Sequence, residues 1–192
     1  YFLKLCYISF MKNLLLPLLT VLFLFSCAEH DSYAQRLLNA DTENESWLLH
    51  GRTYDESRFS PLKDINDSNV ADLGVSWSFE TGTNRGHETT PIVVDGMMFI
   101  TAPWSMVFAL DAKTGEEIWS FDPEIDKAWA RNACCDVVNR GAAVWDDQVI
   151  FATIDGRLIS LDKESGSVNW DVLTIDKSKP YTITGAPRII DG

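Results

Sequence analysis

The sequence predicts an all-β protein, a β-propeller whose four-stranded blades each end in a tryptophan. Short apolar runs alternate with turn signals from about residue 90 onward, and residues 109–119 align with residues 160–170. Four strands per unit, a fixed turn and a closing Trp are typical of radial blades. About two and a half such units fit into the 192 residues, whereas a closed propeller has about four to eight blades.

The first unit begins where Asp95-Gly96 separates two apolar runs, which is a strong hairpin signal. Its predicted strands are residues 91–94, 97–100, 106–111 and 117–121. The pattern then recurs, with predicted strands at residues 142–145, 149–153, 157–162 and 168–170. A third unit is expected to begin at residues 186–192, which makes the fragment end inside a blade.

The turn before the last strand of each unit has the same composition in both repeats. Asp111 and Asp162 each precede a Thr or Ser and then a Gly. The Asp and hydroxyl side chains can hydrogen-bond the local backbone, and Gly supplies a positive φ. Trp119 and Trp170, which follow these turns, are predicted to dock between blades rather than to bind a ligand, and Trp77 belongs to the same class.

Residues 36–70 differ from the repeats because they are polar and lack a strand period. They are predicted to be loop-like, with short helical pieces around residues 64–73. This stretch is expected to pack on the outside of the propeller.

The first residues resemble an export signal. Met11 and Lys12 precede the apolar run 14–25, which is too short for a comfortable membrane span of about 20 residues. Residues 24–27 resemble a bacterial lipobox with Cys27 as the lipidated residue, and ordinary cleavage after Ala34 is the alternative. We therefore interpret residues 1–26 as a leader and residues 27–192 as the folded part, which is predicted to be periplasmic and anchored to the membrane by lipid.

Two adjacent cysteines are the most unusual feature of the folded part. Neighbouring Cα atoms lie about 3.8 Å apart, less than the usual disulfide span of about 4.4–6.8 Å, so a bond between Cys134 and Cys135 closes a strained ring. Such strain collects at functional sites. Disulfides persist after export, and Cys6 and Cys27 lie in the leader region, so each of the pair has only the other as a partner. A vicinal disulfide is predicted, and two unlinked thiols are the alternative.

The charge balance narrows the class of partner. The chain has 16 basic and 28 acidic residues, a net charge of −12. An acidic surface argues against binding to nucleic acid or anionic lipid. The three histidines show no metal-ligand spacing, and nothing resembles a nucleotide-binding loop.

Five motifs carry a resemblance to a known family. They lie at residues 47–51, 58–62, 88–91, 134–141 and 181–187. Together they resemble the N-terminal part of the pyrroloquinoline quinone (PQQ)-dependent alcohol dehydrogenases, over residues 37–192.

The resemblance implies specific cofactor contacts. Cys134 and Cys135 would be the disulfide platform on which the flat PQQ ring stacks, and Arg140 would contact its polar edge. Glu88 and Thr184 resemble polar cofactor contacts. Independently, the rigid fork of donors on Arg suits a planar anion, and the Thr hydroxyl can donate a hydrogen bond.

Each polar contact has an alternative role. Arg140 could pair with Asp136 on its own loop, Glu88 could be a surface carboxylate, and Thr184 a turn residue. Beside an anionic ligand, Glu88 needs a donor on the ring, Arg140, or a proton. Thr153, next to a turn, is predicted to be structural.

The resemblance implies an exported quinoprotein dehydrogenase that oxidises small alcohols with PQQ and passes electrons to an acceptor such as a cytochrome c. Calcium or a lanthanide would act as Lewis acid and a carboxylate as general base. These residues would lie beyond Gly192, so the chain itself is expected to hold no catalytic or metal-binding residue and to be inactive alone. A non-catalytic lipoprotein β-propeller scaffold is the alternative function.

Overall fold

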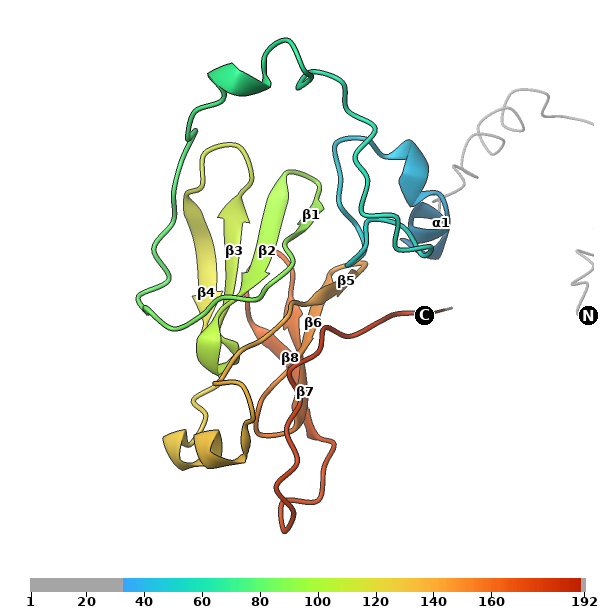
Figure 1. Ribbon diagram of the computed structural model, residues 1–192. Coiled ribbons are helices and arrows are strands. Elements are labelled where there is room, and N and C mark those ends of the chain that lie inside the picture. The colour runs from blue at the N-terminus through green and yellow to red at the C-terminus, as the bar shows by residue number, and fades with distance from the viewer. Residues whose placement is uncertain (1–32, 191–192) are drawn as a thin grey trace, which may run out of the picture. The chain divides into compact units, whose positions relative to one another are not determined.

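The computed structural model describes residues 33–190, in which eight strands form two four-stranded antiparallel sheets (Figure 1). The strand orders are β1-β2-β3-β4 and β5-β6-β7-β8, so each sheet is a meander of consecutive strands. This confirms the predicted all-β units of four strands. The predicted leader and Cys27 lie outside the described residues. The alternative cleavage site, after Ala34, lies at the very start of them.

The first sheet opens with a tight hairpin, as Asp95-Gly96 predicted. Val94 pairs with Met97, and Asp95 and Gly96 have φ values of 53° and 80°, which suits the twist of the flanking strands. Its strands are β1 (Ile92–Val94), β2 (Met97–Thr101), β3 (Val107–Asp111) and β4 (Glu117–Phe121).

The second sheet repeats the first down to an irregularity of the backbone. Its strands are β5 (Ala143–Trp145), β6 (Gln148–Ala152), β7 (Arg157–Asp162) and β8 (Val168–Leu173). The register shifts between Ala109 and Leu110 in β3, and at the equivalent place between Ser160 and Leu161 in β7. The shared bulge shows that the repeat is structural as well as a likeness in sequence.

The turns before β4 and β8 have the predicted hydrogen bonds. Asp111 Oδ1 accepts from the backbone N–H and the hydroxyl of Thr114, at 2.7 and 3.0 Å. Asp162 Oδ1 accepts the same pair from Ser165, at 2.8 and 2.7 Å. These bonds hold the pKa of both carboxyl groups below its usual value, because they stabilise the ionised form.

The closing tryptophans join neighbouring units. Trp119 is 8% exposed, and its indole covers Gly166 so closely that a Cβ atom there would lie 2.7 Å from the ring. Its Nε1–H also donates to the Lys163 carbonyl at 2.9 Å. Trp77 covers Gly115 in the same manner. Docking is thus confirmed for Trp119 and Trp77.

Trp170 behaves differently within residues 33–190. Its Nε1–H donates to Gln148 Oε1 of its own sheet, at 3.3 Å. Its docking against a following unit therefore stays a prediction.

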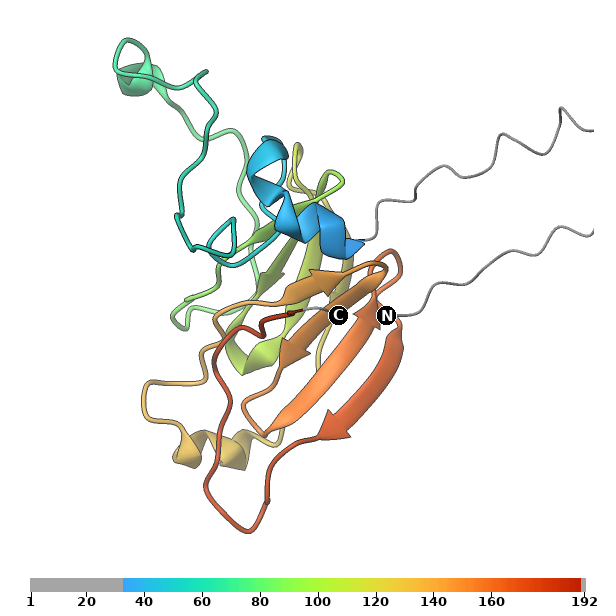
Figure 2. The same ribbon diagram turned by 90° about the vertical axis from the view of Figure 1, so that its right-hand side faces the viewer.

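The main core lies between the two sheets, which Figure 2 shows side by side. Phe99 and Val107 of the first sheet and Phe151 and Ile159 of the second are fully buried in one cluster. The rings of Phe121 and Phe151 pack edge to face with centroids 6.0 Å apart. Burying a side chain of this size stabilises the fold by about 1.5–3 kcal/mol.

One prediction for the N-terminal stretch needs correction. The stretch predicted to be loop-like, residues 36–70, begins inside a helix, α1 (Tyr33–Leu38), which is followed by the 3-10 turn η1 (Ala40–Thr42). Tyr33 and Leu37 lie one helical turn apart, and both are buried in the main core. The Tyr33 ring packs edge to face on Trp145 of β5.

The rest of that stretch follows the prediction in part. Trp47 forms an isolated bridge with Val93, so the chain up to residue 52 packs on the sheets. A short 3-10 turn, η2 (Val70–Asp72), lies where helical pieces were predicted. Between residues 59 and 75 the chain is exposed and extends away from the sheets rather than packing on them (Figures 1 and 2).

Two further observations complete the fold. Residues 186–190 form no strand, because they have no partner strand among the described residues, so the third unit stays a prediction. No helix between residues 33 and 190 is long and apolar enough to cross a membrane.

Candidate functional site

Three predicted site residues lie in the segments that lead into successive units of the repeat. Glu88 lies four residues before β1, and Arg140 lies three residues before β5. Thr184 lies shortly before residues 186–190, where the third unit was predicted. Since successive units lie beside one another, the segments that lead into their first strands meet. The backbone shows this directly: Arg140 N–H donates to the Thr184 carbonyl at 3.0 Å, and Thr90 N–H donates to the Arg140 carbonyl at 3.1 Å.

The three side chains form one connected cluster around Arg140. Its Nη2 lies 2.7 Å from Glu88 Oε2, and its Nη1 donates to Thr184 Oγ1 at 2.6 Å. The side chains of Arg140 and Glu88 are each 41% exposed. The cluster is therefore pre-arranged by its own contacts and still open to a ligand.

The alternative roles can be compared with this geometry. Asp136 forms an ion pair with Arg85 and not with Arg140. Glu88 pairs with Arg140, which is one of the three alternatives predicted to make a carboxylate acceptable beside an anionic ligand. Thr184 uses its hydroxyl to accept from Arg140 rather than to close a turn.

The two adjacent cysteines lie on an exposed loop, with their Sγ atoms 2.7 Å apart. The structure has them as free thiols, whereas a disulfide bond is about 2.05 Å long. The disulfide therefore stays a prediction. The hydrogen bond with Cys134 raises the pKa of the Cys135 thiol; the charge of Glu88 raises it further and that of Arg140 lowers it. The pair thus lies within electrostatic reach of the Arg140 cluster.

The cysteine loop, residues 131–139, is held at both ends. Its start overlaps the 3-10 helix η4 (Lys127–Asn132), which Asp126 caps by accepting from Ala128 N–H at 2.9 Å. Near its end, Val137 is fully buried in a small core with Ile125 and Ile154. The two cysteines and Asp136, in the middle of the loop, are exposed.

Asn139 connects the loop to the second sheet. It is 1% exposed, donates from Nδ2 to the Ala152 carbonyl at 2.8 Å, and accepts from Gly141 N–H at 3.0 Å. The residue between the loop and Arg140 is thereby fixed, which is a structural reason for an Asn before that Arg.

Three residues near the cysteines had no predicted role. Arg85 pairs with Asp136, its guanidinium lies 5.6 Å from the Trp104 ring centroid, and Lys127 Nζ lies 4.2 Å from the same centroid. No local pattern links residue 85 to residue 136, because 51 positions separate them. The predicted structural role of Thr153 fits the geometry, since its buried hydroxyl donates to Asp155 and accepts from Arg157 N–H.

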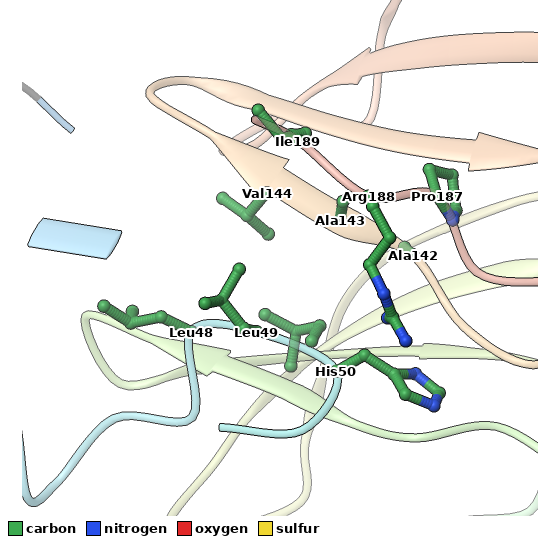
Figure 3. Close-up of a pocket in the computed structure, with 10 residues that line it drawn as sticks. Leu48, Leu49, His50, Ala142, Ala143, Val144, Pro187, Arg188 and Ile189 are labelled. Carbon is green, nitrogen blue, oxygen red and sulfur yellow. The ribbon is translucent and has the colours of Figure 1, made fainter. Parts of the chain in front are cut away.

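A separate small pocket contains none of the predicted site residues. It is lined by Leu48, His50, Val144 and Pro187 among others, and the Arg188 side chain extends toward the His50 ring (Figure 3). His50 Nδ1 is buried without a hydrogen-bond partner. Burial, followed by the charge of Arg188, holds the pKa of His50 below its usual value, so the ring stays neutral near pH 7.

The donor set around Arg140 fits a planar anion such as PQQ. Thr184 accepts one N–H of Arg140, and Glu88 pairs with its other terminal nitrogen as an ion pair, whereas a guanidinium has five N–H donors. Arg140 therefore keeps further N–H donors for a ligand. Within residues 33–190, no group of three His, Cys, Asp or Glu side chains is placed to hold a metal ion.

Comparison with known proteins decides the family. Residues 47–171 match the PQQ family model described as the glucose/ethanol/alcohol dehydrogenase β-propeller domain. The chain belongs to this PQQ β-propeller family. The two sheets are therefore propeller blades, blade 1 (β1–β4) and blade 2 (β5–β8).

Individual relatives agree with the family. The chain is 51% identical over 158 residues to quinohemoprotein alcohol dehydrogenase ADH-IIG of Pseudomonas putida, which is 82% of this chain and 22% of that protein. It is 50% identical over 147 residues to 1-butanol dehydrogenase (cytochrome c) of Thauera butanivorans, covering 76% and 21%. The chain thus spans about a fifth of the length of these curated relatives.

Solved structures show the same fold. The structure of ADHIIG from Pseudomonas putida HK5 superposes with a TM-score of 0.80 at 51% identity, over 82% of this chain and 23% of that one. A europium-containing methanol dehydrogenase superposes with a TM-score of 0.77 at 36% identity, over 81% and 28%.

Proposed function

We propose that this chain supplies cofactor-contacting blades of an exported quinoprotein alcohol dehydrogenase. The observation that carries the proposal is the Arg140 cluster beside Cys134 and Cys135, in a chain whose relatives are named quinohemoprotein alcohol dehydrogenases. PQQ, when bound, supplies the two-electron acceptor for alcohol oxidation. The residues of this chain hold and orient it.

Each residue has a distinct part in that binding. Arg140 offers its remaining N–H donors to the anionic edge of the ring, as a planar fork. Glu88 and Thr184 hold the guanidinium in place, because Glu88 forms an ion pair with one terminal nitrogen and Thr184 accepts a hydrogen bond from the other. Cys134 and Cys135 provide a polarisable surface beside it, where a flat π-system can stack.

We propose that other segments of the enzyme supply the metal ligands and the general base. Between residues 33 and 190 no three His, Cys, Asp or Glu side chains are grouped to hold a metal ion, and the name of the europium-containing methanol dehydrogenase supports a lanthanide, with calcium as the alternative. A small alcohol as substrate and a cytochrome c as acceptor are supported by the name of the Thauera butanivorans relative.

A segment exchange tests the proposed function. In the test chimera, the 158 matched residues of this chain replace the corresponding segment of Pseudomonas putida ADH-IIG. Reconstituted with PQQ and calcium, the chimera is expected to oxidise 1-butanol with an artificial electron acceptor, whereas this chain alone is expected to be inactive. A chimera that folds but binds no PQQ would contradict the proposal and favour the scaffold alternative.

The platform requires a disulfide between Cys134 and Cys135, which is tested separately. Protein recovered from the periplasm is treated with iodoacetamide before and after reduction, and its mass is measured. Two alkylated thiols are expected only after reduction. If both thiols react without reduction, the disulfide is absent and the platform consists of unlinked thiols.

Attachment to the periplasmic side of a membrane by lipid at Cys27 is supported only by the sequence of residues 24–27. The leader fused to a reporter is expected to fractionate with membranes, and Cys27→Ser is expected to release the reporter. Membrane association that survives this substitution would contradict lipidation at Cys27, and a reporter that is already soluble with Cys27 in place would support ordinary cleavage after Ala34.

A further inference from the structure

The residue that follows the cysteine pair has a conformation that requires support. Asp136 has a φ of 69°, in the left-handed region, where a residue with a side chain is strained unless its surroundings enforce it. Asp tolerates this region better than most residues. Even so, the loop must hold it there, because a change at position 136 rotates the backbone that carries Cys135.

Arg85 is the side chain that holds Asp136. Its Nη1 forms an ion pair with Asp136 Oδ1 from a segment 51 positions earlier, which leads into blade 1. The contact therefore ties the exposed middle of the cysteine loop to a second, independent part of the chain.

Trp104 supports the same place from the backbone side. The backbone N–H of Trp104 donates to the Val137 carbonyl at 2.9 Å, and the Arg85 guanidinium lies 5.6 Å from the centroid of the Trp104 ring. Lys127, from η4, lies 4.2 Å from that centroid. Side-chain and backbone contacts thus fix residues 136 and 137 together, and Arg85 contacts both Asp136 and the Trp104 ring.

We propose that Arg85 is a positioning residue for the cofactor platform: by holding Asp136 and resting on Trp104, it fixes the orientation of the Cys134–Cys135 pair. The role in cofactor binding rests on the proposed function, whereas the effect on the loop does not. Arg85 itself needs no contact with the cofactor. It acts through Asp136.

Exposure separates this role from one in overall stability. The side chains of Arg85 and Asp136 are 48% and 38% exposed, and exposed ion pairs contribute little to the free energy of unfolding. The consequence of losing Arg85 is therefore local. Arg131 offers a matched control, because it is an exposed Arg on the same loop that forms no ion pair within residues 33–190.

Amide hydrogen exchange of the full chain tests the effect on the loop. Arg85→Ala is expected to speed exchange of residues 131–138 about fivefold, from loss of the ion pair and the cation–π contact. Exchange of the strand amides should stay unchanged, and so should the whole profile of Arg131→Ala. Arg85→Lys, which keeps a positive charge for Asp136 and leaves position 136 unchanged, is expected to retain part of the slow exchange that Arg85→Ala loses.

The chimera with Pseudomonas putida ADH-IIG tests the effect on the cofactor. Arg85→Ala is expected to weaken PQQ binding about fivefold through loss of the same contacts, and Arg85→Lys is expected to weaken it less. Unchanged loop exchange in Arg85→Ala would overturn the positioning role, whether or not PQQ binding falls. Faster loop exchange with unchanged PQQ binding would support the positioning of the loop and instead contradict the cysteine platform of the proposed function.

Discussion

The joint between the blades and the Arg140 cluster use their side chains in opposite ways. At the joint, Trp119 is 8% exposed, covers Gly166 and satisfies its only donor on the Lys163 carbonyl. In the cluster, Arg140 is 41% exposed and keeps donors that no residue between 33 and 190 takes. The side chain at the joint has its hydrogen bond and its packing partner, whereas the side chain in the cluster is held in place but keeps N–H donors for a ligand.

This difference separates stability from binding in the same two blades. Apolar area removed from water at the joint stabilises the fold. The free N–H donors of the cluster contribute little to the stability of the fold. They can contribute to the binding of a ligand, since a hydrogen bond to a charged group is worth about 1.5–3 kcal/mol. Substitutions in the two regions should therefore change different measurements.

The largest effect is expected at the joint. Trp119→Ala should lower the free energy of unfolding by about 3–5 kcal/mol, because it leaves a cavity between the blades. Gly166→Ala should also destabilise, by about 1–3 kcal/mol, because its Cβ would lie 2.7 Å from the Trp119 ring and its φ is 71°. Chemical denaturation of the full chain measures both. A loss below 1 kcal/mol for Trp119→Ala would show that the joint does not hold the blades together.

The next effect is expected in the cluster and should appear in binding. In the test chimera, Arg140→Ala should weaken PQQ binding by about one to two decades, since it removes a charged hydrogen-bonding partner. Arg140→Lys should recover only part, because an ammonium keeps the charge but lacks the planar fork. PQQ titration beside thermal melting checks this. Binding equal to the parent in Arg140→Ala would show that the site is wrong, whatever the fold.

The smallest effect is expected at Arg36, whose exposure lies between those of Trp119 and Arg140. Arg36, 26% exposed on α1, bonds Glu43 at 2.8 Å and Asp95 at 3.0 Å, and it holds the pKa of both carboxyl groups below the ordinary 4.5 and 3.8. Lowered folded pKa values give stability above the ordinary pKa that is lost as the pH falls through the folded pKa. Arg36→Met should thus cost about 1 kcal/mol at pH 7, and the difference should shrink below about pH 4.

Melting curves of the full chain between pH 7 and pH 3 measure this pH dependence. Lys179→Met is the control, because its ion pair with Asp176 is long, at 4.0 Å, and exposed. A destabilisation by Arg36→Met that is the same at both pH values would attribute the effect to lost packing instead of charge.

The repeated strands could be predicted from sequence because their signals are local. Asp95-Gly96 determines a hairpin within four residues, and the Asp, hydroxyl and Gly of the later turns act on their own backbone. The site residues could be predicted from family resemblance. The sequence left three alternatives for the partner of Glu88, and the ion pair with Arg140 was one of them. It depends on two units lying side by side, which no local pattern specifies.

The errors have the same cause. Helix α1 has six residues and lacks acidic residues in its first turn, so tertiary packing of Tyr33 and Leu37 determines it rather than local propensity. Arg85 was missed because its partner, Asp136, is far away in sequence. In both cases the deciding contact joins segments that lie far apart in the sequence.

The joint between blades also bears on how such a protein can change in evolution. Trp77 on Gly115 and Trp119 on Gly166 are the same attachment made twice, each directed toward the following unit. A copied unit would bring both halves of the attachment with it, a Trp for the next neighbour and a Gly turn for the previous one. Duplication or loss of one unit would therefore leave every remaining joint chemically matched, so the number of units can vary while the contacts between them stay constant.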